Sequence, residues 1–315
     1  MTKVIPTLHI VADNIPQAHY RATKAVHEKG MNIQTQYDRK NSDGSFKDPP
    51  SKDAKVLIEI SNPFNQPRYS VSSYCEIGTY IAEIMGIKDH LVLPLDTLRE
   101  QLKDGHLKAT QWPYSYHQRL FAFPDAEGSV LDQMSLLVDR VAQSPITRRA
   151  VATTRLPSID AHLKDDIPCL GEVQLRCTED SGELYLHMDT KWRSRDLFKA
   201  WADNVIGLTF MQQVLAREIG KKMSRVVHVG SYSDYSSSLH IYGQDYSEKG
   251  VKNYIELGEE AVLGRAMNSD DAADLLVVDQ INTLARRRDF WKFSDAQVSE
   301  LEKLALDIKE GRLIA

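Results

Sequence analysis

The sequence predicts an α/β (α+β) fold in which a twisted sheet is covered by helices, and three stretches carry this prediction. Residues 7–12 read as a short strand that leads into a helical pattern at residues 15–29. Residues 169–188 alternate between apolar and polar side chains on both sides of a turn, which indicates a β-hairpin. Residues 205–219 are long and apolar enough for a central core helix.

The composition favours one elaborated domain with a substantial core. The chain has 315 residues, of which 42% are hydrophobic. Its 39 basic and 44 acidic residues give a net charge of −5, so no broad basic field is available for nucleic acid. Individual arginines are therefore expected to act locally.

Three cysteines, Cys75, Cys169 and Cys177, are too few for a disulfide scaffold and form no CxxC pair. They indicate a reducing, cytoplasmic setting, and we expect no metal. Cys75 and Cys177 read as small buried hydrophobes. The first residues lack a leader pattern, and no stretch approaches ~18 consecutive apolar residues, so we expect a soluble protein that enters no membrane.

The first third of the chain alternates between strands and helices. Pro16 is placed to open the first helix and Gly30 to close it. Residues 38–53 are polar and rich in Gly, Pro and Ser, so we expect an exposed, mobile loop that carries Asp38 and Arg39. The elements expected next are a strand at 55–61, a helix at 71–85 ended by Gly86 and a helix at 95–102.

Residues 112–123 crowd aromatic rings around Tyr116 and lead into a helix whose apolar face runs from Val130 to Val141. The stretch 145–151 then reads as a strand that opens with Arg148 and Arg149. Successive side chains on a strand point to opposite faces, so one partner cannot satisfy both arginines. The last ~70 residues are mostly helical, most clearly at 272–284 and 295–309.

Residues 168–242 gather the side chains that suit chemistry on a small substrate. The predicted hairpin begins at Cys169 and leads to Arg193 and Ser194, so a nucleophile and an anion-binding pair come within reach of one pocket. Asn204 follows on the core helix, although we expect its neighbour Asp203 to be the N-cap of that helix. Such a pocket suits a phosphorylated substrate.

Over residues 35–245 the chain resembles the thymidylate synthase and pyrimidine-nucleotide hydroxymethylase superfamily. The matching motifs occur in the family's order: Asp38-Arg39, Tyr116-His117-Gln118-Arg119, PITRRAV at 145–151, Pro168-Cys169, Arg193-Ser194-x-Asp196 followed by Asn204, and His240-Ile241-Tyr242. Each motif is weak alone, and their joint order is specific. The resemblance implies a thymidylate-synthase-like mixed sheet in residues 1–245 and leaves 246–315 as a helical C-terminal extension packed on the same domain.

The resemblance also implies folate-dependent one-carbon transfer to C5 of a pyrimidine nucleoside monophosphate, with 5,10-methylenetetrahydrofolate as cofactor. Cys169 would add to C6 because a thiolate best activates the ring. Asn204 would hydrogen-bond the base edge, and Tyr116 would move the C5 proton. The residues implied for binding are Arg39, Arg148, Arg149, Arg193 and Ser194 for phosphate, Asp196 within the same motif, and His240 and Tyr242 for the sugar.

One departure from the family pattern leaves the reaction open. The helix at 71–85 lacks the tryptophan that helps steer folate in the bacterial enzymes, and its catalytic glutamate is either Glu76 or Glu83, of which we choose Glu83. Asn204 stands where the dCMP hydroxymethylases have aspartate, which favours uracil. Methylation of dUMP is therefore the first expectation. Hydroxymethylation of dUMP, dCMP or CMP is the second, and a non-catalytic nucleotide-binding relative the third.

The family's assembly implies a homodimer across the sheet face with shared active sites. In that arrangement the strand with Arg148 and Arg149 supplies at least one guanidinium to the phosphate bound by the partner subunit.

Overall fold

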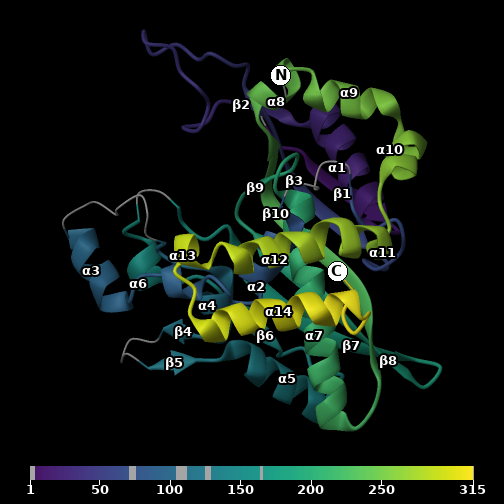
Figure 1. The fold of residues 1–315 in the computed structure, drawn as a ribbon. Coiled ribbons are helices and arrows are strands. Elements are labelled where there is room, and N and C mark those ends of the chain that lie inside the picture. The colour runs from purple at the N-terminus through teal and green to yellow at the C-terminus, as the bar shows by residue number, and fades with distance from the viewer. Residues whose placement is uncertain (1–3, 71–75, 104–111, 125–128, 164–165, 315) are drawn as a thin grey trace.

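The computed structural model describes residues 4–70, 76–103, 112–124, 129–163 and 166–314. A mixed sheet forms its centre (Figure 1). In spatial order its strands are β1 (Thr7–Ala12), β3 (Ser51–Ile60), β10 (Val227–Ile241), β8 (Glu183–Trp192), β7 (Leu170–Asp180) and β6 (Val151–Thr153), with β2 (Met31–Ile33) beside β3 and β9 (Arg195–Asp196) beside β10. The pairs β1–β3, β8–β10 and β9–β10 are parallel, and the others are antiparallel. The expected α/β fold with a twisted, helix-covered sheet is confirmed.

The hairpin expected at 169–188 is formed by β7 and β8. Its connection is Ser181 and Gly182, whose φ angles are +51° and +85°. Two left-handed residues match the twist of the flanking strands, and glycine adopts this conformation without a side-chain clash. At the other end of the hairpin Leu170 pairs with Trp192, so the residues just outside this pair are brought together.

Helices account for most of the remaining chain. The larger ones are α1 (Ile15–Lys29), α2 (Ile77–Ile84), α3 (Leu95–Lys103), α5 (Gln133–Gln143), α7 (Trp201–Met223), α9 (Gly250–Leu257), α12 (Val278–Arg286) and α14 (Asp295–Lys309). The shorter ones are α4 (Tyr116–Phe121), α6 (Pro157–Asp160), α8 (Gly243–Ser247), α10 (Glu259–Arg265), α11 (Ser269–Ala272) and α13 (Arg288–Trp291), with a 3-10 turn at Asp89–Leu91 and a π-helical turn at Ala273–Val277. A separate two-stranded sheet joins β4 (Phe123–Pro124) to β5 (Val130–Leu131).

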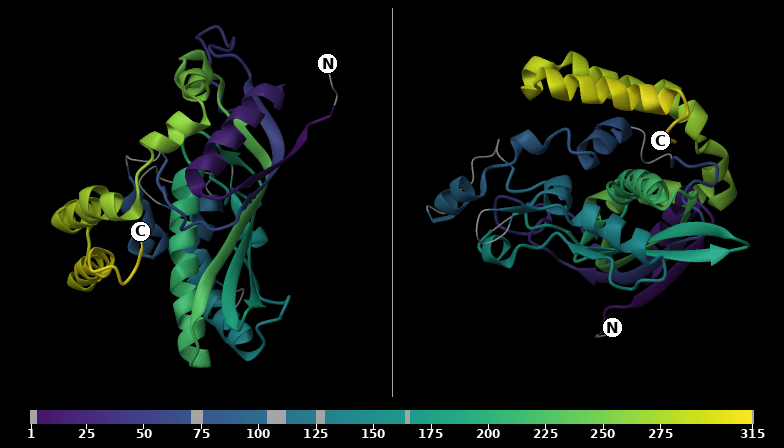
Figure 2. Two further views of the ribbon diagram at one scale, coloured as in Figure 1. Left: turned by 90° about the vertical axis from the view of Figure 1, so that its right-hand side faces the viewer. Right: turned by 90° about the horizontal axis from the view of Figure 1, so that it is seen from below.

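The helices form layers on one side of the sheet. The long helix α7 lies against the sheet, and residues around its whole circumference are buried, among them Ile206 and Phe210 at 0% exposure. Helix α2 packs on α7, and α12 with α14 forms the layer farthest from the sheet (Figure 2). The central core helix is confirmed.

The expectation of a strand over 145–151 is wrong. Strand β6 begins only at Val151, because Thr147 turns the chain before it. The Thr147 amide donates to the Ser144 carbonyl at 2.9 Å, and the Arg149 amide donates to the Thr147 hydroxyl at 3.2 Å. These local bonds replace strand pairing, so the alternation argument does not apply to Arg148 and Arg149, and both side chains are exposed.

Two further boundaries differ from expectation. Helix α7 begins at Trp201 with Ala200 as N-cap, so Asp203 lies inside the helix and the N-cap prediction is wrong. Trp201 is buried and its indole donates to the Asp234 carboxylate at 3.0 Å, and these contacts favour a helix start at Trp201 over one after Asp203. Helix α2 begins at Ile77, and the expected helical residues 71–75, with Cys75, lie outside the described residues.

The loop expected over 38–53 is exposed only in its central part. Asp38 is buried and accepts hydrogen bonds from the Thr35 amide at 2.5 Å and the Ser51 hydroxyl at 3.1 Å. Strand β3 starts at Ser51, earlier than the expected 55. Asp38 therefore anchors the base of the loop, while Arg39 stays exposed.

The residues after 245 pack against the rest of the chain at several points. The Gln297 amide donates to the Ile87 carbonyl at 2.9 Å, and His90 Nε2 donates to the Trp291 carbonyl at 2.8 Å. Leu301 of α14 is fully buried in the main core cluster. We therefore keep the prediction that residues 246–315 pack on the same domain as residues 1–245, and we expect the two parts to unfold together.

Leu301→Ala tests this prediction. Removal of a fully buried leucine should lower the free energy of unfolding by about 2–5 kcal/mol. Urea unfolding followed by tryptophan fluorescence and by circular dichroism should keep one shared transition. Leu306→Ala on the same helix is the matched control, because its side chain is 47% exposed and the change should cost below about 0.5 kcal/mol. Two separate transitions in the wild type would contradict the single-domain assignment.

Candidate functional site

Cys169 lies just before β7, at the end of the hairpin opposite its turn, which is called the base of the hairpin below. The Arg193 amide, just after β8, donates to the Cys169 carbonyl at 2.9 Å. The Arg193 guanidinium folds back over the same loop, where Nε donates to the Pro168 carbonyl at 3.1 Å and Nη2 to the Ile167 carbonyl at 2.6 Å. The hairpin thus brings the thiol and this guanidinium together, as the sequence predicted.

The Cys169 thiol is partly buried, and its environment acts on its ionisation in two directions. Burial raises the pKa of Cys169 above its ordinary value, while the positive charges of Arg193 and Arg195 oppose that rise. The negative charge of Asp166 adds to the rise. A cation that approaches the thiol therefore increases the fraction of nucleophilic thiolate.

Tyr116 faces the same loop from the first turn of α4, which is capped by Ser115. Its hydroxyl accepts the Leu170 amide at 3.3 Å, and its ring meets the edge of Trp192 at a centroid distance of 5.8 Å. Burial, followed by the negative charge of Cys169, raises the pKa of Tyr116 to about 12. The phenol therefore keeps its proton at neutral pH beside the Cys169 thiol.

Asn204 sits on the first turns of α7, and both ends of its amide are engaged. Its Oδ1 accepts from Arg195 Nε at 3.2 Å, and its Nδ2 donates to the Tyr80 hydroxyl at 2.8 Å. Arg195 is 3% exposed and pairs with Asp234 of β10 at 2.9 Å. Sequence reasoning missed Arg195, Asp234 and Tyr80. The sequence carried no signal for them beyond the position of Arg195 between two candidate site residues, Ser194 and Asp196.

Asp196, His240 and Tyr242 form a second group beside Cys169. Strand β9 pairs with β10 so that Asp196 lies opposite His240. Burial raises the pKa of Asp196 to about 6, and its Oδ1 accepts the amides of Phe198 and Lys199 at 3.0 and 3.1 Å. The rings of His240 and Tyr242 meet edge to face at 4.7 Å.

Tyr242 lies close enough to both Asp196 and Cys169 for their charges to act on its hydroxyl. Burial, and then the negative charges of Asp196, Tyr37 and Cys169, raise the pKa of Tyr242 to about 12. Burial lowers the pKa of His240, so its imidazole is neutral at physiological pH. A neutral imidazole and a phenol can each donate or accept a hydrogen bond, which suits hydroxyl groups of a sugar.

Arg39 lies near Tyr242, at a cavity of about 190 Å³ lined by Tyr37, Asp38, Arg39, Asp48, Tyr242 and Gln244. Its guanidinium pairs with Asp48 at 2.5 Å and with Glu248 at 3.0 Å. These carboxylates raise the pKa of Arg39. An anion that binds Arg39 must compete with both of them.

The two candidate glutamates occupy different positions on α2. Glu83 pairs with Lys88 at 3.2 Å, and burial raises the pKa of Glu83, an effect opposed by Lys88. Its charge also acts on Tyr80, the partner of Asn204. Glu76 is exposed at the N-terminal end of the helix. Glu83 is therefore the glutamate that neighbours the Asn204 network, and its catalytic role stays a prediction.

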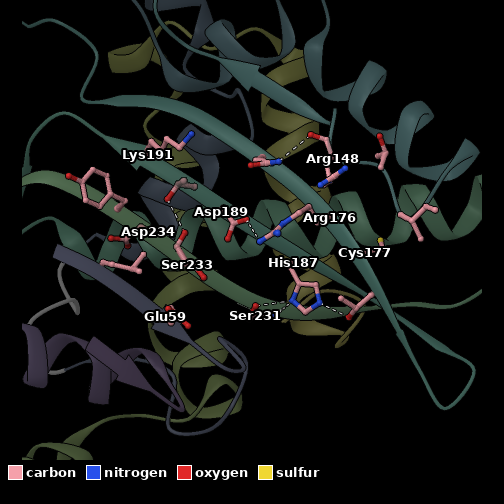
Figure 3. A pocket seen from close by; sticks show the side chains of 17 residues that line it. Glu59, Arg148, Arg176, Cys177, His187, Asp189, Lys191, Ser231, Ser233 and Asp234 are labelled. Carbon is pink, nitrogen blue, oxygen red and sulfur yellow. Dashed lines mark hydrogen bonds and ion pairs between the residues drawn. The ribbon is translucent and has the colours of Figure 1, made fainter. Parts of the chain in front are cut away.

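Arg148 and Arg149 lie apart from Cys169. The Gln174 side chain donates to the Arg148 carbonyl at 3.4 Å, and Gln174 lies about 16 Å beyond Cys169 along β7 at the usual strand rise. Arg148 lines a cavity of about 640 Å³ on the open sheet face, together with Arg176 and His187 (Figure 3). The structure therefore does not bring these two arginines into the Cys169 pocket of their own chain.

Within the described residues, no three histidine, cysteine or carboxylate side chains are grouped as a metal ion would require. No helix in the described part of the chain is both long and apolar enough to cross a membrane.

Comparisons with known proteins point to one family. A family model described as thymidylate synthase matches residues 97–284. The chain is 35% identical over 133 residues to a "Putative thymidylate synthase" of Methanocaldococcus jannaschii, which covers 41% of this chain and 55% of the relative. It is 30% identical over 146 residues to the protein of the same name from Methanopyrus kandleri, at 46% and 62% coverage. The chain thus spans between about half and two thirds of the length of these curated relatives.

A solved structure gives the same fold. The thermostable thymidylate synthase A from Bacillus subtilis aligns with a TM-score of 0.52 and 18% sequence identity, over 77% of this chain and 84% of that chain. At this identity the likeness concerns the fold alone.

The ionisation of Cys169 can be measured by its alkylation with iodoacetamide, followed by peptide mass spectrometry. Because burial raises the pKa, the rate should rise with pH to a midpoint above the ordinary value of 9.0. Arg193→Gln removes an opposing positive charge and should move the midpoint higher. Cys177, whose pKa burial raises to about 11, is the slower internal reference. A wild-type midpoint near neutrality would contradict this description of the site.

Proposed function

The chain belongs to the thymidylate synthase family, and on that premise we propose that it methylates dUMP at C5 to give dTMP. The observation that carries the proposal is the convergence of Cys169, Arg193 and Tyr116 at the base of the hairpin. Asn204 and the His240–Tyr242 pair add groups suited to a base and a sugar. Arg195, which binds Asn204, and Tyr242 both interact with the charge of Cys169.

Cys169 is the proposed nucleophile. C5 of a pyrimidine reacts poorly with electrophiles until a thiolate adds at C6 and turns the ring into an enolate. The partly buried position of Cys169 keeps water away, and Arg193 favours the thiolate that burial disfavours. The Cys169 sulfur forms the C6 bond and leaves again once C5 has lost its proton.

Tyr116 and Asn204 act on the two sides of the activated ring. The raised pKa of Tyr116 keeps the phenol protonated, so it relays the C5 proton through water rather than removing it as a free anion. Asn204 offers one N–H to the charge that develops on O4, where a fixed donor stabilises the enolate. Glu83, linked to Asn204 through Tyr80, supports the same edge of the base.

The phosphate contacts come from separate elements. Arg193 and Ser194 follow β8, while Arg39 comes from the loop before β3. A phosphate dianion carries more negative charge than a single carboxylate and forms charge-assisted bonds with arginine, so it would compete with Asp48 and Glu248 for Arg39. Tyr242 lines the cavity of Arg39, its pKa responds to the charge of Cys169, and the His240 ring packs against it, so this pair is placed to contact the sugar.

The proposed cofactor is 5,10-methylenetetrahydrofolate, which would supply the one-carbon unit and, for a methyl product, the hydride. Asp196 fits a reduced pterin, because its partly buried carboxylate accepts N–H donors and only Oδ1 is engaged by the backbone amides of Phe198 and Lys199. Lys88, beyond the end of α2, lies between the rings of Trp112 and Trp291, at 5.6 and 4.9 Å from their centroids. These indoles supply the tryptophan rings that α2 itself lacks.

Hydroxymethylation is the second candidate, and the absence of tryptophan from α2 favours it. A methyl product needs a dry site in which the exocyclic methylene is reduced, whereas a hydroxymethyl product needs water to add to that methylene. Mass analysis of the product made from dUMP, and in parallel from dCMP, distinguishes the two. If the protein binds both nucleotides and converts neither, the result would support the third hypothesis, a non-catalytic nucleotide-binding relative.

The proposed assembly is a homodimer across the open sheet face. Arg148 and Arg149 are exposed there and lie about 16 Å along β7 from the thiol of their own chain. A second subunit on this face would receive at least one of these guanidiniums in its phosphate site, and each pocket would then be composite.

Cys169→Ala should abolish product formation and leave the dissociation constant for dUMP within about tenfold, since the phosphate contacts carry most ground-state affinity. Product is measured by mass spectrometry and binding by calorimetry. Cys177→Ala, which alters a buried thiol farther along β7, is the matched control and should retain activity. Turnover by Cys169→Ala above ~1% of the wild type would remove the nucleophile assignment.

Mixing inactive Cys169→Ala with inactive Arg149→Ala protein should restore activity to at most about a quarter of the sites, because heterodimers contain one complete pocket. Subunit exchange is followed by native mass spectrometry of differently tagged chains. No recovery despite demonstrated exchange would mean that Arg149 acts within its own chain or in folding.

A further inference from the structure

Arg195 lies beneath the proposed base site, where sequence reasoning assigned no role. It stands on β9 between Ser194 and Asp196, with its side chain 1% exposed. Nη1 donates to the Asp234 carboxylate at 2.9 Å, and Nη2 lies 3.4 Å from the Trp201 carbonyl. The guanidinium carbon is 3.9 Å from the ring centroid of Trp192. The guanidinium is therefore held on several sides.

One hydrogen bond of Arg195 fixes the direction of the Asn204 amide. Arg195 Nε can only donate, so the Asn204 atom 3.2 Å away must be the oxygen. A flipped amide would place N–H against N–H at this distance inside the protein, without water to separate them. The contact of the Asn204 amide with Tyr80 does not fix which way the amide points. The Tyr80 hydroxyl accepts from Nδ2 at 2.8 Å, and after a flip it could equally donate to Oδ1.

The hydrogen-bond donor and acceptor positions that remain free on the Asn204 amide match only one type of base edge. An amide has two acceptor positions and two N–H groups. Arg195 uses one acceptor position and Tyr80 uses one N–H, which leaves one of each at fixed places. Uracil presents N3–H and O4, which fit the free acceptor and donor. Cytosine presents N3 and N4–H₂ in reversed order and would need the flipped amide.

We propose that Arg195 is a positioning residue that makes the site selective for uracil over cytosine, by preventing the Asn204 amide from flipping. The inference rests on the proposed function, because it takes Asn204 as the contact to the base edge. Asp234 has a supporting role, since it holds Arg195 in place, and Trp201 Nε1 donates to the same carboxylate oxygen at 3.0 Å.

Arg195→Lys is the first test variant. Lysine keeps a positive charge for Asp234 and places a methylene where Arg195 has Nε, so Asn204 becomes free to flip. The measurement is the ratio of the dissociation constants of dCMP and dUMP, obtained by calorimetry on the full-length protein. The wild type should prefer dUMP by about tenfold to a hundredfold, the range of one matched pair of hydrogen bonds. In the variant this preference should fall by about tenfold, mainly through tighter binding of dCMP.

The double variant Arg195→Met with Asp234→Asn repeats the test without a buried unpaired charge. The amide oxygen that Asp234→Asn introduces can still accept the N–H of Trp201. Tyr80→Phe is the matched control, because it removes the other bond of the Asn204 amide without removing the obligate donor. It should weaken both nucleotides alike and leave their ratio within about threefold of the wild type. A purely structural role of Arg195 would also weaken both nucleotides alike.

Folded Arg195→Lys or double-variant protein that keeps the wild-type ratio would overturn the inference. The wild-type protein also tests the inference by itself. If its dissociation constants for dUMP and dCMP lie within about threefold of each other, the inference is overturned even if neither variant folds. Conversion of dUMP by such an unselective wild type would leave the proposed function standing. A wild type that binds neither nucleotide would instead overturn the proposed function, and the inference with it.

Discussion

A charge moved from water into a protein interior costs several kcal/mol unless a partner of opposite charge is held against it. Arg195 and Asp234 meet this condition at 2.9 Å, with side-chain exposures of 1% and 0%. They come from β9 and β10, and Trp201 at the start of α7 bonds to the same carboxylate. The pair can therefore form only when two strands and the core helix have reached their final positions.

The position of Asn204 depends on this pair. Asn204 lies one turn after Trp201 on α7, so the contact of Trp201 with Asp234 sets where the helix begins and which way the amide faces. Arg195 then fixes the amide itself. A residue that would touch the substrate is thus placed by an ion pair that touches no substrate, and loss of either charge would disturb the site as well as the core.

A second buried contact holds the segment that follows β9, which begins at Leu197. His19 of α1 donates from Nε2 to the Leu197 carbonyl at 3.1 Å and accepts the Tyr254 hydroxyl of α9 at 2.8 Å. Burial lowers the pKa of His19 to about 4, so the ring stays neutral and both bonds persist at physiological pH. The segment that carries Asp196 is therefore fixed between the first helix and the C-terminal helices.

The sequence predicted elements whose causes are local. Helix α1 has its bounds as expected, because Asn14, Pro16 and Gly30 act within one turn of the ends. The hairpin β7–β8 followed from alternation, and its closure brought Cys169 to Arg193. The inward direction of Arg195 was not predictable, because its reason is Asp234, which lies far along the chain. The strand expected over 145–151 was wrong at Arg148 and Arg149, because a side-chain bond of Thr147 replaced the expected strand pairing.

The same electrostatics link the nucleophile to the proposed composite pocket. Arg193 supports the Cys169 thiolate against a pKa raised by burial. A phosphate dianion bound by Arg193 would cancel part of that field, because two negative charges would stand near a third. Further cations at the phosphate are then required for the thiol to ionise in the complex. Arg39 of the same chain would supply one, and Arg148 or Arg149 of a second subunit would supply another, which would give the proposed shared pocket a catalytic reason beyond affinity.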